Sequence, residues 1–525
     1  MSTASEGKRK YIFESAPVSK AVWSMAIPTV VTQLINIIYN YADTWYVGRT
    51  ANAAMVAALG VSFPMFVIMA AIANLFGIGG ASVISRALGE GNRKKARETF
   101  ATCFWFGLLG AVVYMAVINL FRSRIIYLVG GDENDFQYVS SYMFWTMIIG
   151  AIPSVGNVLC GHLVRSIGAS KEAGIGMSMG GILNIILDPI FMFVILPDGM
   201  EVTGAAMATL ISNTAAFIYF LIYMKRRDIR SSAGGGAATS GVRGSDAGSA
   251  ERTESGKNAE HAAGGRISDT AGAGSEAGDA EQSRAQYPGI INLKLPEAGA
   301  IWPALSPVLL IGFPAALQTT LAMVSNIFAN VLIRPYGSSA VAGMGVAKKI
   351  NMIAFNTCMG MTMGVLPLLG YSFGAKNFNR MRRIIRYTGT VVVLFGSACT
   401  AVFVIGAPEM IRFFIDESGS VEYGTEFLRI IGFAAPMAAL SYLAYTVFQS
   451  AGMEKSAFIL SILRKGVLDI PGMFILRAFM EARGVCLATP VAEILSVFIG
   501  LFLYASFRRK IDAMDVETGE GSLSA

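Results

Sequence analysis

Charged residues are scarce in this sequence of 525 residues. They make up 15% of the chain against 54% hydrophobic residues, and the mean hydropathy is +0.54. A soluble protein of this length needs far more polar surface, so that class is excluded. The apolar stretches reach the roughly 20 residues of a membrane-spanning helix, whereas barrel strands would alternate over about 10 residues. The sequence therefore predicts an all-α polytopic membrane protein.

Histidine and cysteine are also scarce, which excludes several kinds of chemistry. With His162 and His261 as its two histidines, the chain has no H-E-x-x-H zinc-protease motif. Ser255-Gly256-Lys257 is followed by Asn258 and does not complete a Walker A loop, which argues against ATP as the energy source. We expect no enzyme activity and no cofactor. The cysteines fall within or beside apolar stretches and are interpreted as small core residues: Cys103, Cys160, Cys358, Cys399 and Cys486.

Twelve apolar stretches are predicted to span the membrane: 21–46, 53–80, 98–121, 138–162, 175–196, 203–224, 303–333, 338–369, 387–409, 424–450, 456–479 and 485–507. The polar segment 1–20 is basic and contains no cleavable signal peptide. The even-numbered connections are rich in Lys and Arg, so we expect a plasma-membrane protein with segment 1–20 and tail 508–525 in the cytosol. These connections also explain the net charge of +7, so nucleic-acid binding is not expected.

The two halves of the chain, 21–230 and 301–507, repeat each other. Pairs 285 positions apart are Gln33 with Gln318, Gly60 with Gly345, Gly79 with Gly364, Gly89 with Gly374 and Asn92 with Asn377. The spacing later drifts, to 283 for Pro153 and Pro436, 284 for Gly168 and Gly452, and 280 for Thr209 and Thr489. Six spans per half make the repeat parallel, with a pseudo-twofold axis along the membrane normal and substrate bound between two six-helix lobes.

The connection 231–300 has a different composition. Its central part, 231–286, is made of small and polar residues without any aromatic, and Val242 and Ile267 are its larger aliphatic side chains. Such a segment buries too little apolar area to offset the entropy of ordering it. We therefore predict a disordered cytosolic linker that the transport step does not need.

Carboxylates inside the spans of the first half are the strongest functional candidates, because each costs about 2.5–3.5 kcal/mol to insert. Asp43 lies near the outer end of its span, and Asp188 lies one helical turn after Asn184, in the outer half of another. Thr209 falls at a similar depth, and Pro189 can free a backbone carbonyl beside Asp188. These oxygens suit a hard cation such as Na⁺, or the two aspartates could share a proton. Alternatively, Asp43 caps a helix end and Asp188 makes only structural hydrogen bonds.

The second half carries buried bases instead. Lys348 and Lys349 lie well inside one span, and Arg464 and Lys465 lie near Asp469 in another. Mutual pairing with Asp469 and a role in substrate binding or gating both remain open. Asp43 corresponds to Phe328, so the coupling carboxylates are expected mainly in the first half. The candidates for a substrate cavity are Gln33, Asn157, Gln318 and Lys349, although membrane amides often only bridge helices.

Several motifs resemble the multidrug and toxic compound extrusion (MATE) family. They are Ala42-Asp43-Thr44-Trp45-Tyr46-Val47-Gly48-Arg49, Leu59-Gly60, Ser85-Arg86-Ala87-Leu88-Gly89-Glu90-Gly91-Asn92, Gly370-Tyr371-Ser372-Phe373-Gly374-Ala375-Lys376-Asn377 and Gln449-Ser450-Ala451-Gly452. The resemblance implies two lobes in a V around a central cavity. It also implies a monomer that exports amphipathic, often cationic, drugs or toxins in exchange for Na⁺ or H⁺.

The resemblance extends to one branch of the family. Asp43, Asn184, Asp188 and Thr209 fall on the cation-site positions of the DinF-like branch. The NorM-like branch carries acidic residues in helices 7 and 10, whereas Glu422 and Glu426 lie only at the rim of helix 10 here. A lipid-linked precursor flippase of the same superfamily is the alternative, although those proteins usually have fourteen spans. A passive channel or an intramembrane enzyme is less consistent with the lopsided carboxylates.

Overall fold

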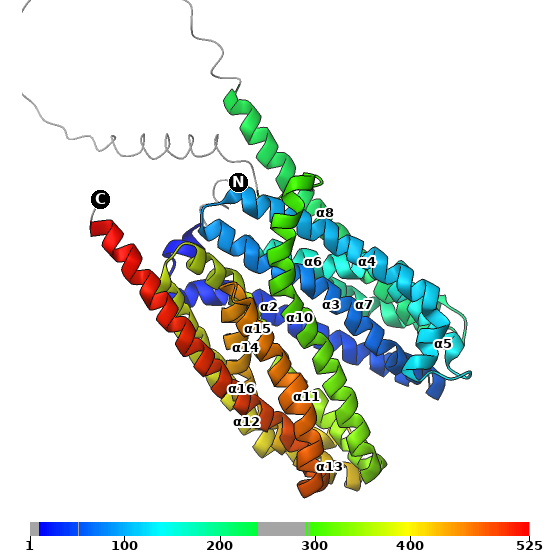
Figure 1. The fold of residues 1–525 in the computed structure, drawn as a ribbon. Helices are drawn as coiled ribbons and strands as arrows, with labels where there is room; N and C mark the ends of the chain where they lie inside the picture. Colours follow the sequence, from blue (N-terminus) through cyan, green and yellow to red (C-terminus); the bar gives the residue numbers. More distant parts are fainter. Residues whose placement is uncertain (1–9, 51, 240–289, 292, 524–525) are drawn as a thin grey trace, which may run out of the picture.

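The computed structural model describes residues 10–50, 52–239, 290–291 and 293–523, which form long helices and no strand (Figure 1). Nine of these helices are long and apolar enough to cross a membrane, and two bent pairs raise the number to eleven. One of the nine, Glu454–Asp515, has 62 residues, and its backbone leaves the helical region at Glu481 (φ 54°, ψ −132°). It therefore counts as two spans, because about 20 residues cross a bilayer. The described residues thus contain the twelve predicted spans.

The first six spans form the N-lobe. Its elements are η1 (Tyr11–Ser15), α2 (Val18–Gly48), α3 (Ala53–Gly89), α4 (Arg93–Val129), α5 (Phe136–Met143), η2 (Phe144–Ile149), α6 (Ala151–Ser166), α7 (Ser170–Ile190), η3 (Phe191–Ile195) and α8 (Glu201–Thr239). The span made by α5, η2 and α6 bends by 52°.

The last six spans form the C-lobe. Its elements are α10 (Ala298–Ile333), η4 (Arg334–Tyr336), α11 (Ser338–Gly374), α12 (Phe378–Arg412), α13 (Ser418–Gly432), α14 (Ala435–Ser450), α15 (Glu454–Ser461), η5 (Ile462–Asp469) and α16 (Ile470–Leu523). The span made by α13 and α14 bends by 43°, which repeats the bend of the N-lobe. Pro153 and Pro436, a pair of the repeat, lie in the first turn after each bend, where a helix tolerates proline.

The lobes are pressed together at the end of the bundle that carries both chain termini, here called the terminal end (Figure 1). A Cβ atom added to Gly89 would overlap the Tyr371 carbonyl, and one added to Gly374 would overlap the Arg86 carbonyl. The two backbones approach so closely that only glycine fits, as in other membrane helix contacts. At the opposite end, here called the far end, the tips labelled α5 and α13 lie apart.

Helices α4 and α12, which occupy corresponding places in the two lobes, both begin at an asparagine N-cap. The Asn92 side chain accepts a hydrogen bond from the Lys95 amide at 3.0 Å and caps α4. Asn377, its partner in the repeat, accepts one from the Arg380 amide at 3.0 Å and caps α12. Asparagine is among the best residues at this position because it satisfies an amide that has no partner in the helix.

Both segments beside the first and last spans pack against the C-lobe. In segment 1–20, the described residues begin at 10, and Phe13 is buried and stacks on Tyr371 at 4.8 Å. The Arg380 guanidinium donates to the carbonyls of Ile12 and Ala16, each at 2.9 Å. The tail 508–525 continues α16 to Leu523 and is paired with α12 through ion pairs of Arg382.

The linker predicted at 231–300 is shorter than expected at both ends. Helix α8 continues to Thr239, and Ile291 is buried against the apolar core of the N-lobe. The Trp105 indole donates to the Leu293 carbonyl at 3.1 Å, so this stretch is held against α4. The composition rule missed these residues because Ile290, Ile291 and Leu293 form a small apolar cluster beyond the polar part. Residues 240–289, the greater part of the predicted linker, lie outside the described residues.

Candidate functional site

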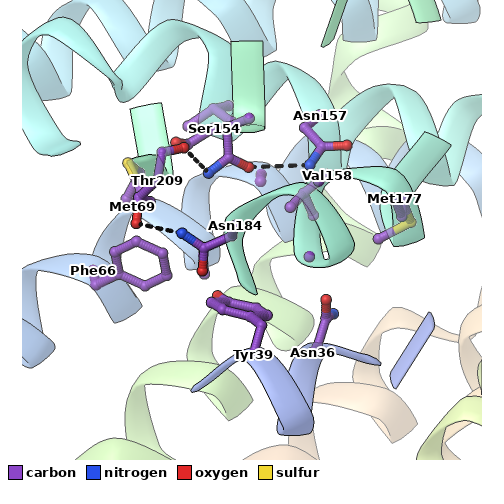
Figure 2. Close-up of a pocket in the computed structure, with 16 residues that line it drawn as sticks. Asn36, Tyr39, Phe66, Met69, Ser154, Asn157, Val158, Met177, Asn184 and Thr209 are labelled. Atoms are coloured by element: carbon purple, nitrogen blue, oxygen red, sulfur yellow. Dashed lines mark hydrogen bonds between the residues drawn. The ribbon is translucent and has the colours of Figure 1, made fainter. Parts of the chain in front are cut away.

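Helices α7 and α8 bring three of the four predicted cation-site residues into contact. Asn184 and Asp188 lie one turn apart on α7, and both are buried. The Asn184 amide donates to Asp188 Oδ1 at 2.9 Å. It also lies 3.2 Å from Thr209 Oγ1 on α8, to which it donates (Figure 2). Thr209 is buried as well. The amide therefore holds the carboxylate and the hydroxyl in a fixed arrangement.

Asp43 reaches the same neighbourhood from α2. A Cβ atom at Gly174 would lie 2.8 Å from the Pro28 side chain, and one at Gly181 would lie 2.7 Å from the Ile35 side chain. On each helix the two contact points are seven residues apart, which is about two helical turns. Another two turns along the same pair of helices bring the next contact to the neighbourhood of Asp43 and Asp188. No hydrogen bond joins the two carboxylates: the Asp188 bond that is present comes from Asn184, and Asp43 Oδ1 has no partner among the described residues. The sequence correctly places Asp43 near the other three.

The oxygen atoms of this cluster are not all used. Asp43 Oδ1, Asn184 Oδ1 and Asp188 Oδ2 are buried and accept no hydrogen bond from the residues that the structure describes. A buried carboxylate oxygen without a partner is costly, and carboxylate and amide oxygens are ligands of hard cations. The donor set therefore fits a monovalent cation or a proton. The alternative that Asp43 caps a helix end is not supported, because Asp43 lies within α2, which ends at Gly48.

A cavity of about 100 Å³ adjoins the cluster inside the N-lobe. It is lined by Asn184 and Thr209 together with Asn36, Tyr39, Asn157 and Asn213 (Figure 2). Drug-sized ligands usually occupy about 300–1,000 Å³, so this space suits an ion and water rather than a drug. Tyr39 is a lining residue that the sequence did not single out.

The predicted cavity residues are spread over different surfaces. Asn157 lines the N-lobe cavity, where its amide donates to Asn213 Oδ1 at 3.1 Å. Gln33 lies where α2 meets α11 of the other lobe, against Gly360. The Lys349 ammonium lies 5.6 Å from the centre of the Tyr41 ring, also between α2 and α11. Gln318 is half-buried on α10. The structure does not bring these four residues together in one pocket.

The C-lobe contains a buried ionic network. Lys465 donates to Asp469 at 2.9 Å, which confirms the predicted pairing for this lysine. Arg464 instead donates to both oxygens of Glu493 on α16, at 2.8 and 2.9 Å. Lys348 does not pair with Asp469 and donates to Asn330 Oδ1 at 3.3 Å. Glu493 was missed, although a carboxylate within the apolar stretch 485–507 was a signal for it.

The fold and the site define an α-helical membrane transporter with two repeated six-helix lobes. The sequence model of the MatE family matches residues 28–190 and 314–475, more than half of the chain. The chain therefore belongs to the MATE family of transporters, as its motifs predict.

Individual relatives match almost the whole chain. The chain is 27% identical over 512 residues to the multidrug export protein MepA of Staphylococcus aureus (strain NCTC 8325 / PS 47), covering 97% of this chain and 98% of that protein. It superimposes on a crystal structure of a MATE protein in complex with MaL6 with a TM-score of 0.77 at 21% identity, over 96% of this chain and 99% of that one. An outward-facing multidrug resistance MATE family transporter also gives a TM-score of 0.77, at 20% identity over 96% and 98%.

Proposed function

We propose that this protein exports amphipathic, often cationic, small molecules across the cell membrane in exchange for Na⁺ or H⁺. The observation that carries the proposal is the set of three buried oxygens without hydrogen-bond partners, on Asp43, Asn184 and Asp188. A transporter needs such a site because a downhill ion must bind with different affinity in its two conformations. The similarity to a multidrug export protein supports the class of substrate.

We infer that helix α2 couples ion binding to the movement of the two lobes, because it packs against both. It packs against α7 of the N-lobe through Pro28 and against α11 of the C-lobe through Ala26. In the proposed cycle, a cation or proton neutralises Asp43 and Asp188, and α2 then moves against α7 and α11. Drug is released on the far side as the lobes rock about their contact at the terminal end.

The orientation follows from charge. We infer that the terminal end, with its basic connections, faces the cytosol and that the far end faces outward. In this orientation the cation site lies in the outer half of the N-lobe. In this orientation the close contact of α3 and α11 at Gly89 and Gly374 lies on the cytosolic side.

The proposal is tested by dye efflux from proteoliposomes with a Na⁺ gradient and a pH gradient imposed separately. Wild type should respond to at least one gradient, and Asp188→Asn should lose that response while remaining folded, because the amide cannot neutralise a cation. Asp198→Asn is the matched control, because Asp198 is an exposed carboxylate just after the same span. Gradient-driven efflux near wild type in Asp188→Asn would disprove the assignment.

A further inference from the structure

The N-lobe cation cluster has a counterpart in the C-lobe at an almost constant spacing. The four pairs are Asn184 with Lys465 and Asp188 with Asp469, 281 positions apart, and Thr209 with Thr489 and Asn213 with Glu493, 280 positions apart. The members of each cluster lie on matching spans, α7 and α8 in one lobe and η5 and α16 in the other. Pseudo-symmetry thus relates the two clusters residue by residue.

The contact between the central aspartate and the residue one turn before it is also repeated. Asn184 donates to Asp188, and at the matching position the Lys465 ammonium donates to Asp469 Oδ2 at 2.9 Å. Thr489 donates to Asp469 Oδ1 at 3.1 Å. Ser325 adds a further hydrogen bond to Oδ2 at 2.7 Å. Both oxygens of Asp469 therefore have partners, whereas Asp188 Oδ2 has none among the described residues.

The two clusters differ in their net charge. In the N-lobe, the four positions hold two amides, a hydroxyl and a carboxylate, and Asp43 adds a second negative charge. In the C-lobe, Lys465 offsets Asp469 and the buried Arg464 offsets Glu493. Buried charges persist when they are paired, and each charge of this network has a counter-charge, although Arg464 Nη2 has no hydrogen-bond partner among the described residues. The carboxylates of the N-lobe cluster have no positive counter-charge, whereas those of the C-lobe cluster are neutralised by basic side chains of the same chain.

We propose that the C-lobe contains a second, latent cation site on Asp469 and Thr489, which is permanently occupied by the tethered ammonium of Lys465. The inference rests on the proposed cation site of the N-lobe. Its ligand class is a monovalent cation, Na⁺ or a proton, and Lys465 takes the place of that cation. The charge of the C-lobe then stays constant through the transport cycle, and only the N-lobe exchanges an ion with the solution.

The test uses the Asp188→Asn background, which weakens the N-lobe cluster, and each C-lobe variant is compared with that background. Equilibrium binding of radiolabelled Na⁺ and proton uptake by potentiometric titration are measured on the purified full chain. Adding Lys465→Asn recreates the amide, carboxylate and hydroxyl of the N-lobe and should add an equivalent of bound Na⁺ or of a titrating proton. Adding Asp469→Asn as well should remove it. Lys465→Arg, the control that keeps the tethered charge, should add none.

Lys348 is included in the test because it is a further lysine of this lobe and is hydrogen-bonded to Asn330 of α10, the helix whose Ser325 donates to Asp469. If Lys465→Asn gains a cation only when Lys348→Met is added, the latent site is supported and Lys348 is its substitute occupant. If the folded protein gains neither Na⁺ nor a proton even with both lysines replaced, the inference is overturned.

The reciprocal substitution decides the matter if the C-lobe variants do not fold. Asn184→Lys places an ammonium beside Asp188, at the position that Lys465 has beside Asp469. It should abolish cation binding by the N-lobe while the thermal transition is retained. Cation binding equal to wild type in Asn184→Lys would overturn the inference. Failure of the proposed function looks different, because wild type and Asp188→Asn would then bind equal amounts of cation.

Discussion

At the scale of single residues, the two lobes treat buried charge in opposite ways. Asp188 has an oxygen without a hydrogen-bond partner among the described residues, whereas every charge of the Arg464, Lys465, Asp469 and Glu493 network is paired. Burial makes both arrangements sensitive to single substitutions. The first should control function and the second should control stability, since removing one member of a buried pair leaves the other uncompensated.

The prediction at this scale concerns Glu493→Gln. It leaves the buried Arg464 guanidinium without its counter-charge, and such a loss typically costs about 3–5 kcal/mol. The temperature of thermal unfolding in detergent should fall markedly. Glu426→Gln is the control, because Glu426 pairs with Arg483 at an exposed position, where a pair contributes about 0–1 kcal/mol. Equal stability of the two variants would show that the network is dispensable.

At the scale of elements, α2 contacts α7 of the N-lobe and α11 of the C-lobe through one short stretch around Pro28. Pro28 lies inside it and removes one helical hydrogen bond, which provides a place to bend. The Thr32 hydroxyl donates to the Pro28 carbonyl at 2.9 Å and lies 3.2 Å from Ser178 of α7. Pro28 therefore lies between the terminal end and Asp43, on the face that meets α7.

The prediction at this scale is reciprocal coupling through α2. If ion binding changes the affinity for drug, drug must change the affinity for the ion by the same factor. A bound drug should therefore weaken ion binding in wild type, and Pro28→Ala should reduce that effect. Isothermal titration with and without a bound drug measures both. Unchanged ion affinity in wild type would disprove the coupling, whereas wild-type coupling in Pro28→Ala would disprove only the role of the bend.

At the scale of the whole molecule, the lobes are covalently joined through the segment 240–289, between α8 and the docked residues Ile291 and Leu293. Glycines of α3, α10 and α11 bring the helices of the two lobes close together at their non-covalent contact. A Cβ atom at Gly312 would overlap the Leu75 carbonyl, which shows how closely α3 and α10 approach. The rocking motion proposed above depends on this contact rather than on the connecting segment.

The prediction at this scale is that segment 240–289 is dispensable. Replacing it with a Gly/Ser linker of equal length should keep dye efflux within about twofold of wild type, since such linkers leave the joined parts free to move. Ile291→Asp should instead lower the thermal stability, because it places a charge in the N-lobe core. Loss of efflux in a linker variant that inserts normally would reveal a regulatory role for the segment.

The sequence by itself determined the class, the twelve spans and the repeat, because long apolar stretches and glycines at a fixed spacing are local signals. It also placed Asn184 and Asp188 on one helix face, since residues four apart on a helix are neighbours.

Only the tertiary structure decided which charges meet. Glu493 lies 29 residues after Arg464, and the two pair because α16 folds back against η5. The packing of residues 10–17 and of Ile291 likewise depends on apolar surfaces of helices that are distant in the sequence. Pairing between spans follows from how the helices pack, and the hydropathy of each span taken alone carries no information about its neighbour.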